Sequence, residues 1–129
     1  MNMVLNEEQV LLRDTMKAFL QEHADVSAMR TLRDTKDPIG YSLPLWQQLT
    51  ELGVGAIVMS EAYGGLGFGF LGLGAVMQEM GRTLTATPLL SSVILGASAI
   101  ELAGSASQRQ ALLPAIAAGK LTLTLAVDE

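Results

Sequence analysis

Charge is distributed unevenly along this chain, and that constrains its fold more than any single motif. Residues 1–51 hold 13 charged side chains, whereas the longer segment 52–129 holds only 8. So few charges cannot cover an ordinary solvated surface, and we expect the later segment to bury one flank against something outside this chain. Half of the 129 residues are hydrophobic and the mean hydropathy is positive, which excludes the disordered class.

The composition also excludes several classes of function. The formal net charge of −5 leaves no basic excess for binding nucleic acid or an anionic membrane. Zero cysteines exclude disulfides, a cysteine nucleophile and thiolate metal sites. The single histidine, His23, cannot supply the several histidine ligands of a typical zinc site, so no metal is expected.

No targeting or membrane segment is expected. The first eight residues already contain Glu7 and Glu8 and no apolar core, unlike a secretory signal. The uncharged stretch 83–100 is long, but its three threonines and three serines are too many hydroxyls for a lipid-facing span. We interpret it as a buried helix and expect a cytoplasmic protein.

Helix start and stop signals predict an all-α fold of five to six helices. Asn6 with Gln9 is typical of a capping box. Ser42 and the pair Thr87-Pro88 are further start signals, and glycines follow the expected ends. Pro114 should break or restart the last helix. The expected helices span residues 7–24, 43–52, 70–81, 88–103 and 106–118, and residues 25–40 are expected to be a loop with at most one helical turn.

The last segment has a different periodicity. From Leu121 to Val127, leucines and valine alternate with threonines and alanine, which predicts a β-strand. A single strand has no ladder partner, so the chain resembles one that is cut at the start of another domain. We therefore expect a helical domain over residues 1–120 and the first strand of a missing β-domain over 121–129.

Two motifs suggest chemistry that the sequence context does not favour. Gly67, Gly69 and Gly72 satisfy G-x-G-x-x-G, but the preceding apolar run ends near Met59 and residues 83–100 hold no acid for a ribose. We interpret this motif as a structural loop. His23 lacks a nucleophile elbow for a catalytic triad.

Taken in order, the motifs resemble the N-terminal α-helical domain of the acyl-CoA dehydrogenase family. The resemblance covers essentially the whole chain, and the ordered set is far more specific than any one motif. The matching segments are Leu5–Gln9 with Leu12-Arg13, Leu45-Trp46 with Leu49, Glu51–Gly53, Glu61–Gly67, Glu79–Arg82, Leu113-Pro114 and Ala118–Lys120.

The resemblance implies an FAD enzyme that introduces a 2,3-double bond into an acyl-CoA thioester. In that family a carboxylate base removes the α-proton, the β-hydride passes to the flavin, and an electron-transfer partner reoxidises it. Apart from the first strand of the middle β-domain, expected at residues 121–129, that β-domain and the C-terminal helical bundle with the catalytic glutamate have no counterpart in this chain. We therefore expect no catalytic residue here, no FAD retained by this chain alone, and a homo- or hetero-oligomer with the remaining domains.

The resemblance also indicates residues near substrate and cofactor. A mostly apolar wall with small hydroxyls suits an aliphatic or ring-bearing acyl group. The helix after Gly81-Arg82 is expected to wall the acyl pocket with Thr87, Pro88, Ser91, Ser92 and Leu95. The end of the strand is expected to approach the flavin with Leu125, Val127 and Asp128.

Asp128 departs from the family pattern, which commonly has threonine there. A carboxylate near a flavin disfavours the anionic reduced ring. Ser60 also replaces the proline expected before Glu61. These departures and the charge-poor later segment leave an alternative: a non-catalytic helical subunit or interaction module that pairs with a flavin-bearing chain.

Overall fold

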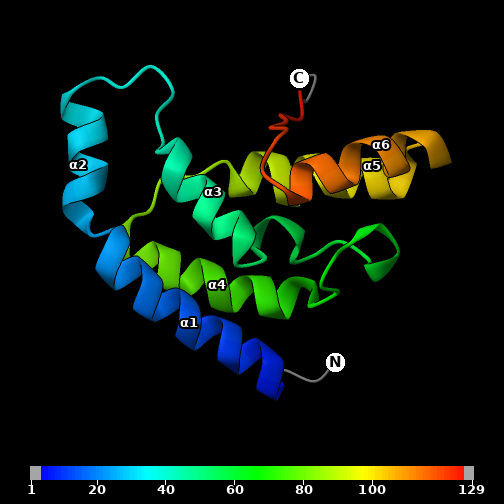
Figure 1. Ribbon diagram of the computed structural model, residues 1–129, viewed down its shortest axis with the longest axis horizontal. Helices are drawn as coiled ribbons and strands as arrows, with labels where there is room; N and C mark the ends of the chain where they lie inside the picture. The colour runs from blue at the N-terminus through cyan, green and yellow to red at the C-terminus, as the bar shows by residue number, and fades with distance from the viewer. Residues whose placement is uncertain (1–3, 127–129) are drawn as a thin grey trace. The chain divides into compact units, whose positions relative to one another are not determined.

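The computed structural model describes residues 4–126, which form two compact units. The first unit comprises residues 4–45 and 68–86, and the second comprises 46–67 and 87–126. The structure confirms the all-α fold class. Figure 1 shows the helices of these residues.

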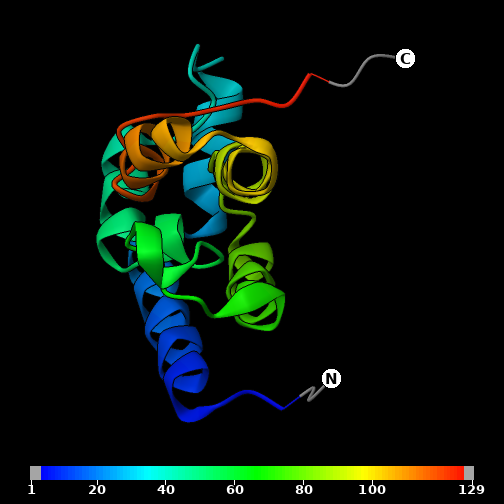
Figure 2. The same ribbon diagram turned by 90° about the vertical axis from the view of Figure 1, so that its right-hand side faces the viewer.

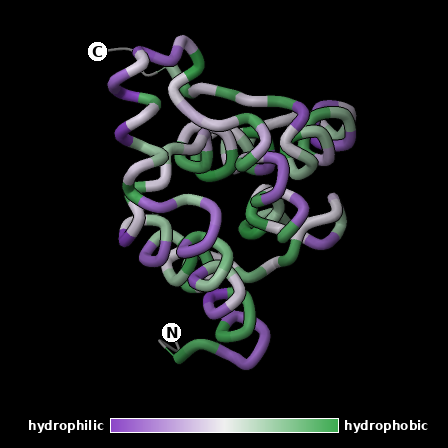
Figure 3. The backbone as a smooth tube through the Cα atoms, turned by 60° about the vertical axis from the view of Figure 1, so that its left-hand side comes forward, coloured by the Kyte–Doolittle hydropathy of each residue, from purple (hydrophilic) through white to green (hydrophobic). Residues whose placement is uncertain are grey.

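Helix α1 (Glu7–His23) begins where the sequence predicts. The Asn6 side chain accepts a hydrogen bond from the Gln9 N–H at 2.8 Å, and Gln9 Oε1 accepts one from the Asn6 N–H at 3.0 Å. This capping box satisfies two helix-end groups that would otherwise lack partners. Hydrophilic and hydrophobic residues alternate along this part of the chain in Figure 3, as an amphipathic helix requires.

Helix α2 (Val26–Asp34) corrects the prediction of a loop over residues 25–40. Asp25 is its N-cap and accepts a hydrogen bond from the Ala28 N–H at 3.2 Å. None of its residues is buried, but Val26, Met29 and Leu32 recur at intervals of three and are half-buried, as on one face of a helix. The Asp25 cap is the second signal, because aspartate at such a position satisfies free N–H groups at a helix start.

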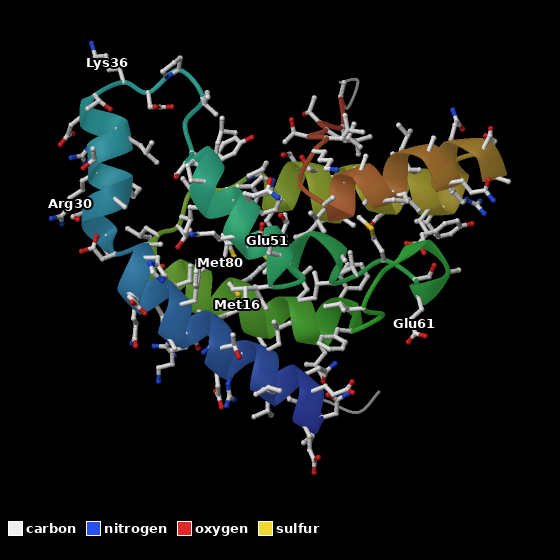
Figure 4. All side chains as sticks on the ribbon, viewed as in Figure 1. Met16, Arg30, Lys36, Glu51, Glu61 and Met80 are labelled. Carbon is white, nitrogen blue, oxygen red and sulfur yellow. The ribbon has the colours of Figure 1, made fainter. Side chains whose placement is uncertain are left out.

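Helices α1 and α4 (Gly69–Thr83) pack together in the first unit and run in the same direction (Figure 1). Gln9 Nε2 donates a 3.0 Å hydrogen bond to the carbonyl oxygen of Phe68, which joins the starts of the two helices. Met16 of α1 and Met80 of α4 are both buried (Figure 4). The expected helix over 70–81 is thus confirmed and is slightly longer.

Helix α3 (Leu43–Glu51) begins after Ser42, whose hydroxyl accepts a hydrogen bond from the Leu45 N–H at 3.3 Å. The chain passes from the first unit to the second within this helix. Two 3₁₀ turns follow, η1 (Val54–Ala56) and η2 (Glu61–Tyr63). The carboxylate of Glu101 accepts a 3.1 Å hydrogen bond from the Ser60 N–H and ties the start of η2 to a later helix of the same unit.

The predicted helix over 88–103 consists of two parts. Its first part is the π-helix η3 (Leu89–Ala97), and its second is α5 (Ser98–Ala103). The periodicity predicts a helix but does not distinguish π from α geometry. The start signal predicts Thr87 as the N-cap and Pro88 as the first helical residue, whereas in the structure Pro88 is the N-cap and the helix begins at Leu89.

Helix α6 (Ala106–Ala117) contains Pro114 in its interior, so the prediction of a break there was wrong. Proline removes one hydrogen bond to the residue four positions earlier. Both Pro114 and Gln110 are exposed, so water can bind the carbonyl that the proline leaves free. The Pro114 carbonyl accepts a hydrogen bond from Ala118, and the helix therefore continues.

The predicted strand is not formed between residues 121 and 126, which carry no strand in the structure. A strand needs a backbone ladder, and a serine hydroxyl takes its place here: Ser92 Oγ accepts a 2.8 Å bond from the Leu123 N–H and donates a 3.2 Å bond to the Leu123 carbonyl. Figure 2 shows this segment passing beside the helix that η3 and α5 form. Residues 127–129 lie outside the described part.

Candidate functional site

The five residues expected to wall an acyl pocket lie just before η3 or within it. Thr87 and Pro88 precede η3, and Ser91, Ser92 and Leu95 belong to it. Thr87 and Ser91 are half-buried, and Leu95 is 41% exposed. Pro88 and Ser92 are buried. Three of the five residues are thus partly open to solvent, and two are not.

The hydroxyl groups of this segment differ in what they bind. Ser92 is 1% exposed, and Leu123 occupies its hydroxyl on both the donor and the acceptor side. Ser91 donates a 3.3 Å hydrogen bond to the Pro88 carbonyl within its own turn. Ser92 therefore holds the segment after α6 against the helix, whereas Ser91 remains beside the open face.

The π geometry sets this helix apart from the others. π-helices of any length are rare and are frequently found at functional sites. The residues of η3 carry no charge, and Leu90 is 56% exposed in addition to Leu95. An uncharged, partly open helical face of this kind suits contact with an apolar group.

Of the residues expected near a flavin, only Leu125 lies within the described part. Its side chain is 46% exposed, two residues beyond the serine-bound Leu123. One exposed side chain can contact a flavin but does not enclose an isoalloxazine ring by itself. Val127 and Asp128 lie outside the described residues.

The first unit contains a cavity of about 260 Å³ that the sequence interpretation missed. Most of its wall is apolar, and its hydroxyls already have partners: Thr83 and Thr85 bond each other at 2.6 Å, and Ser42 caps α3. Because α2 was predicted as loop, no cavity beside that helix could be foreseen. The lining residues are Ala24, Asp25, Ala28, Met29, Thr31, Leu32, Ser42, Leu45, Thr83, Thr85 and Ala86.

Asp25 is the one carboxylate in this lining. The Ser27 hydroxyl donates a 2.6 Å hydrogen bond to it, and with the Ala28 N–H this bond holds the pKa of Asp25 below its ordinary value. The group is therefore charged at neutral pH, and its lone pairs are used by the start of α2. It acts as a helix cap and is unsuited to proton transfer.

The charged side chains described here do not form a further candidate site. Arg82 Nε lies 3.1 Å from Oε2 of the buried Glu79, an ion pair within α4. Glu61, the acid of the segment Glu61–Gly67, points away from η2 into solvent (Figure 4). Among residues 4–126 no group of histidines and acids could hold a metal ion, and no helix is long and apolar enough to cross a membrane.

Comparison with known proteins decides the family. The model of the "Acyl-CoA dehydrogenase, N-terminal domain" matches residues 6–120. The chain belongs to the acyl-CoA dehydrogenase family. Isovaleryl-CoA dehydrogenase of Bos taurus mitochondria is 35% identical over 127 residues, which is 97% of this chain and 29% of that protein. Acyl-CoA dehydrogenase IpdE2 of Mycolicibacterium smegmatis is 35% identical over 91 residues, 70% of this chain and 29% of that protein.

Solved structures of acyl-CoA dehydrogenases share the fold. The ChsE4-ChsE5 complex from Mycobacterium tuberculosis matches with a TM-score of 0.83 and 28% identity, over 96% of this chain and 34% of that chain. A variant of the Tcur3481-Tcur3483 steroid ACAD matches with a TM-score of 0.81 and 30% identity, over 92% and 32%. The chain thus spans about a third of the length of the acyl-CoA dehydrogenases that it resembles.

Proposed function

We propose that this chain is the N-terminal helical domain of an FAD-dependent enzyme that α,β-dehydrogenates an acyl-CoA thioester. The observation that carries the proposal is the family match over residues 6–120, together with 35% identity to an isovaleryl-CoA dehydrogenase over nearly the whole chain. In this proposal the chain works in the cytoplasm, supplies no catalytic base and is inactive alone. The remaining domains hold the flavin, and an electron-transfer partner reoxidises it.

The open face of η3 is the part that meets substrate in this proposal. Thr87, Ser91 and Leu95 form a mostly apolar wall against the acyl group, and the absence of charge on η3 supports that role. Ser92 is buried, does not meet substrate, and fixes the segment 121–126 through the backbone of Leu123. Pro88 starts the helix and lies on its buried side.

The segment 121–129 becomes the first strand of the middle β-domain in this proposal. The residues 121–126 are extended and lack a ladder in this chain, so a neighbouring strand could pair with them. Leu125, Val127 and Asp128 then approach the flavin, which accepts the β-hydride when it is bound. A carboxylate at Asp128 would disfavour the anionic reduced ring.

A second candidate is a partner subunit in a heteromeric dehydrogenase. Two of the matching structures carry paired names, the ChsE4-ChsE5 complex and the Tcur3481-Tcur3483 steroid ACAD. The second name also supports a ring-bearing acyl group. In this alternative the chain shapes the pocket while a different chain holds the flavin.

The test uses the complete product of the gene that encodes this chain. We expect it to bind FAD and to lose flavin absorbance when a branched-chain or ring-bearing acyl-CoA is added without an electron acceptor. Flavin binding only after co-expression with a second dehydrogenase chain would favour the partner subunit. No flavin reduction by any acyl-CoA, alone or co-expressed, would contradict both candidates.

The wall is tested by filling it. Leu95→Phe should lower the rate of flavin reduction by the bulkiest accepted acyl-CoA roughly tenfold. The larger side chain would take up space that the acyl group needs, and about one methylene group of space in an apolar pocket already changes the rate by that factor. Leu102→Phe is the matched control, because Leu102 is 83% exposed on α5. Equal effects of the two substitutions would remove Leu95 from the wall.

A further inference from the structure

A single buried side chain holds the segment after α6 by both backbone groups of one residue. Ser92 is 1% exposed, and its Oγ accepts a 2.8 Å hydrogen bond from the Leu123 N–H and donates a 3.2 Å bond to the Leu123 carbonyl. In an antiparallel ladder, two residues of a hydrogen-bonded pair exchange the same two bonds. The Ser92 hydroxyl therefore replaces a residue of a neighbouring strand and fixes where Leu123 lies along η3.

Gly96, four residues further along η3, fixes the side chain of the same residue. A Cβ atom added to Gly96 would lie 2.7 Å from the Leu123 Cβ and 2.9 Å from its Cδ1, so a larger residue would push Leu123 away. Leu123 is thus held by its backbone at Ser92 and by its side chain at Gly96. Two contacts at different points of one helix oppose both sliding and turning of the segment (Figure 2).

Leu123 is also the last described point at which the chain is fixed to the helices. Before it, the Leu121 N–H donates a 3.2 Å hydrogen bond to the Ala115 carbonyl. After it, residues 124–126 are exposed and form no hydrogen bond within the described part of the chain. The hold on Leu123 therefore sets the direction in which the chain leaves the helical domain.

The same helix carries side chains that the proposed function assigns to the acyl group. Ser91 and Leu95 each directly precede one of the two residues that hold Leu123. Leu125, which the proposed function brings to the flavin, lies about 6–7 Å beyond Leu123 at the rise of an extended chain. The contact at Leu123 thus joins the two sides of the proposed reaction site.

We propose that Ser92 is a positioning residue for the dehydrogenation, because it sets the register between the acyl-contacting helix and the segment that leads to the flavin. This inference rests on the proposed function. A slip by one residue would shift the segment by about 3.3 Å and turn each of its side chains to the opposite face. Misplacement by about 1 Å can slow a reaction between two bound groups about a hundredfold. Ser92 itself touches neither substrate nor flavin and acts through Leu123.

Glu101 provides the matched control for a role in stability alone. Its carboxylate accepts a 3.1 Å hydrogen bond from the Ser60 N–H, so it too joins two segments of the same unit through a backbone group. Neither Glu101 nor Ser60 belongs to the acyl wall or to the segment 121–126. Loss of this bond weakens the unit without releasing Leu123.

The test compares Ser92→Ala with Glu101→Ala in the complete product of the gene, with FAD in excess. We expect Ser92→Ala to slow flavin reduction by bound acyl-CoA roughly tenfold or more, because the reacting groups are misaligned. The dissociation constant of the acyl-CoA should stay the same, since the wall residues are unchanged. Glu101→Ala should change neither quantity.

Two further measurements do not depend on turnover. In the protein without flavin, amide exchange at Leu123 should become faster in Ser92→Ala and should stay the same in Glu101→Ala. With oxidised FAD bound, the visible circular dichroism of the flavin should change in Ser92→Ala alone, because that signal depends on the residues around the ring. Far-ultraviolet circular dichroism shows that the helices are intact in both variants.

The outcomes separate this inference from the function on which it rests. Equal slowing of flavin reduction by the two substitutions would overturn it, because Ser92 would then act through stability alone. A natural rate in Ser92→Ala would also overturn it, whether or not exchange at Leu123 becomes faster. A natural protein whose flavin no acyl-CoA reduces would contradict the proposed function itself, and the inference with it.

Discussion

Helices α4 and η3 are both apolar and both contain glycine, yet Gly74 of α4 and Gly96 of η3 have opposite surroundings. In η3 a Cβ atom on Gly96 would lie 2.7 Å from the Leu123 Cβ and 3.2 Å from the Ser91 carbonyl oxygen. In α4 a Cβ atom on Gly74 would lie in open space. Gly96 of η3 therefore has a close neighbour within its own unit, whereas Gly74 of α4 has none among residues 4–126.

This difference separates two uses of glycine in an otherwise similar sequence pattern. Gly96 permits a segment of extended chain to lie directly on η3, where Ser92 binds its backbone. Gly74 weakens its helix and permits nothing within the chain. A glycine in a helical segment thus predicts close approach, but the sequence does not tell which segment approaches.

The largest expected effect tests whether the two helices are packed equally well. Leu73 of α4 and Leu89 of η3 are 4% and 3% exposed, and they form a matched pair. Either Leu→Ala change should lower the free energy of unfolding by about 2–5 kcal/mol through lost burial and a cavity. Urea unfolding measures both. A loss for Leu89→Ala below about 1 kcal/mol would show that the π-helix is loosely packed.

The same comparison predicts opposite signs for two Gly→Ala changes. Gly96→Ala should destabilise the chain by about 1–3 kcal/mol, because the new methyl group overlaps Leu123 and has no free space. Gly74→Ala should stabilise it by up to about 1 kcal/mol, since it raises helix propensity without a clash. Thermal unfolding at a concentration where the chain is monomeric measures both. Equal signs would refute the distinction.

The sequence predicts the helices best where their ends carry explicit signals. Asn6 with Gln9 forms the expected capping box, and Ser105 with Gln108 forms a second one at the start of α6. Helix α2 was missed because residues 25–40 are mostly polar and charged, which outweighed the Asp25 cap and the apolar spacing of Val26, Met29 and Leu32. The continuation of α6 through Pro114 depends on solvent reaching an exposed carbonyl, which the local pattern does not encode.

The candidate site was less accessible to sequence reasoning than the fold. Ser91 and Ser92 are equivalent small hydroxyl residues in the sequence, but the hydroxyl of Ser92 is occupied by Leu123, which is 31 residues away. The alternation over 121–127 predicts an extended segment, and its pairing partner cannot be read from it. Tertiary partners therefore decide what the pattern leaves open.

The contact between η3 and its neighbour can be weakened without adding volume. Ser92→Ala removes the hydroxyl that binds both the N–H and the carbonyl of Leu123, and should cost about 1–2 kcal/mol. Ser91→Ala is the control, because Ser91 bonds only within its own turn. Amide exchange should become faster at Leu123 in the first variant alone. Unchanged protection there would mean that Gly96 packing suffices.

The smallest expected effect concerns α2 and depends on pH. The pKa of Asp25 is lowered in the folded chain from its ordinary value of 3.8, so its contribution to stability is fully present above about pH 4 and is lost as the pH falls through the folded pKa. Acidification should therefore loosen α2 before the better-buried α1 and α4, as residue-specific amide exchange would reveal. Asp25→Asn keeps a capping side chain that does not titrate, so it should remove this pH dependence and retain the helix. If α2 in the asparagine variant loosens over the same pH range, another carboxylate controls it.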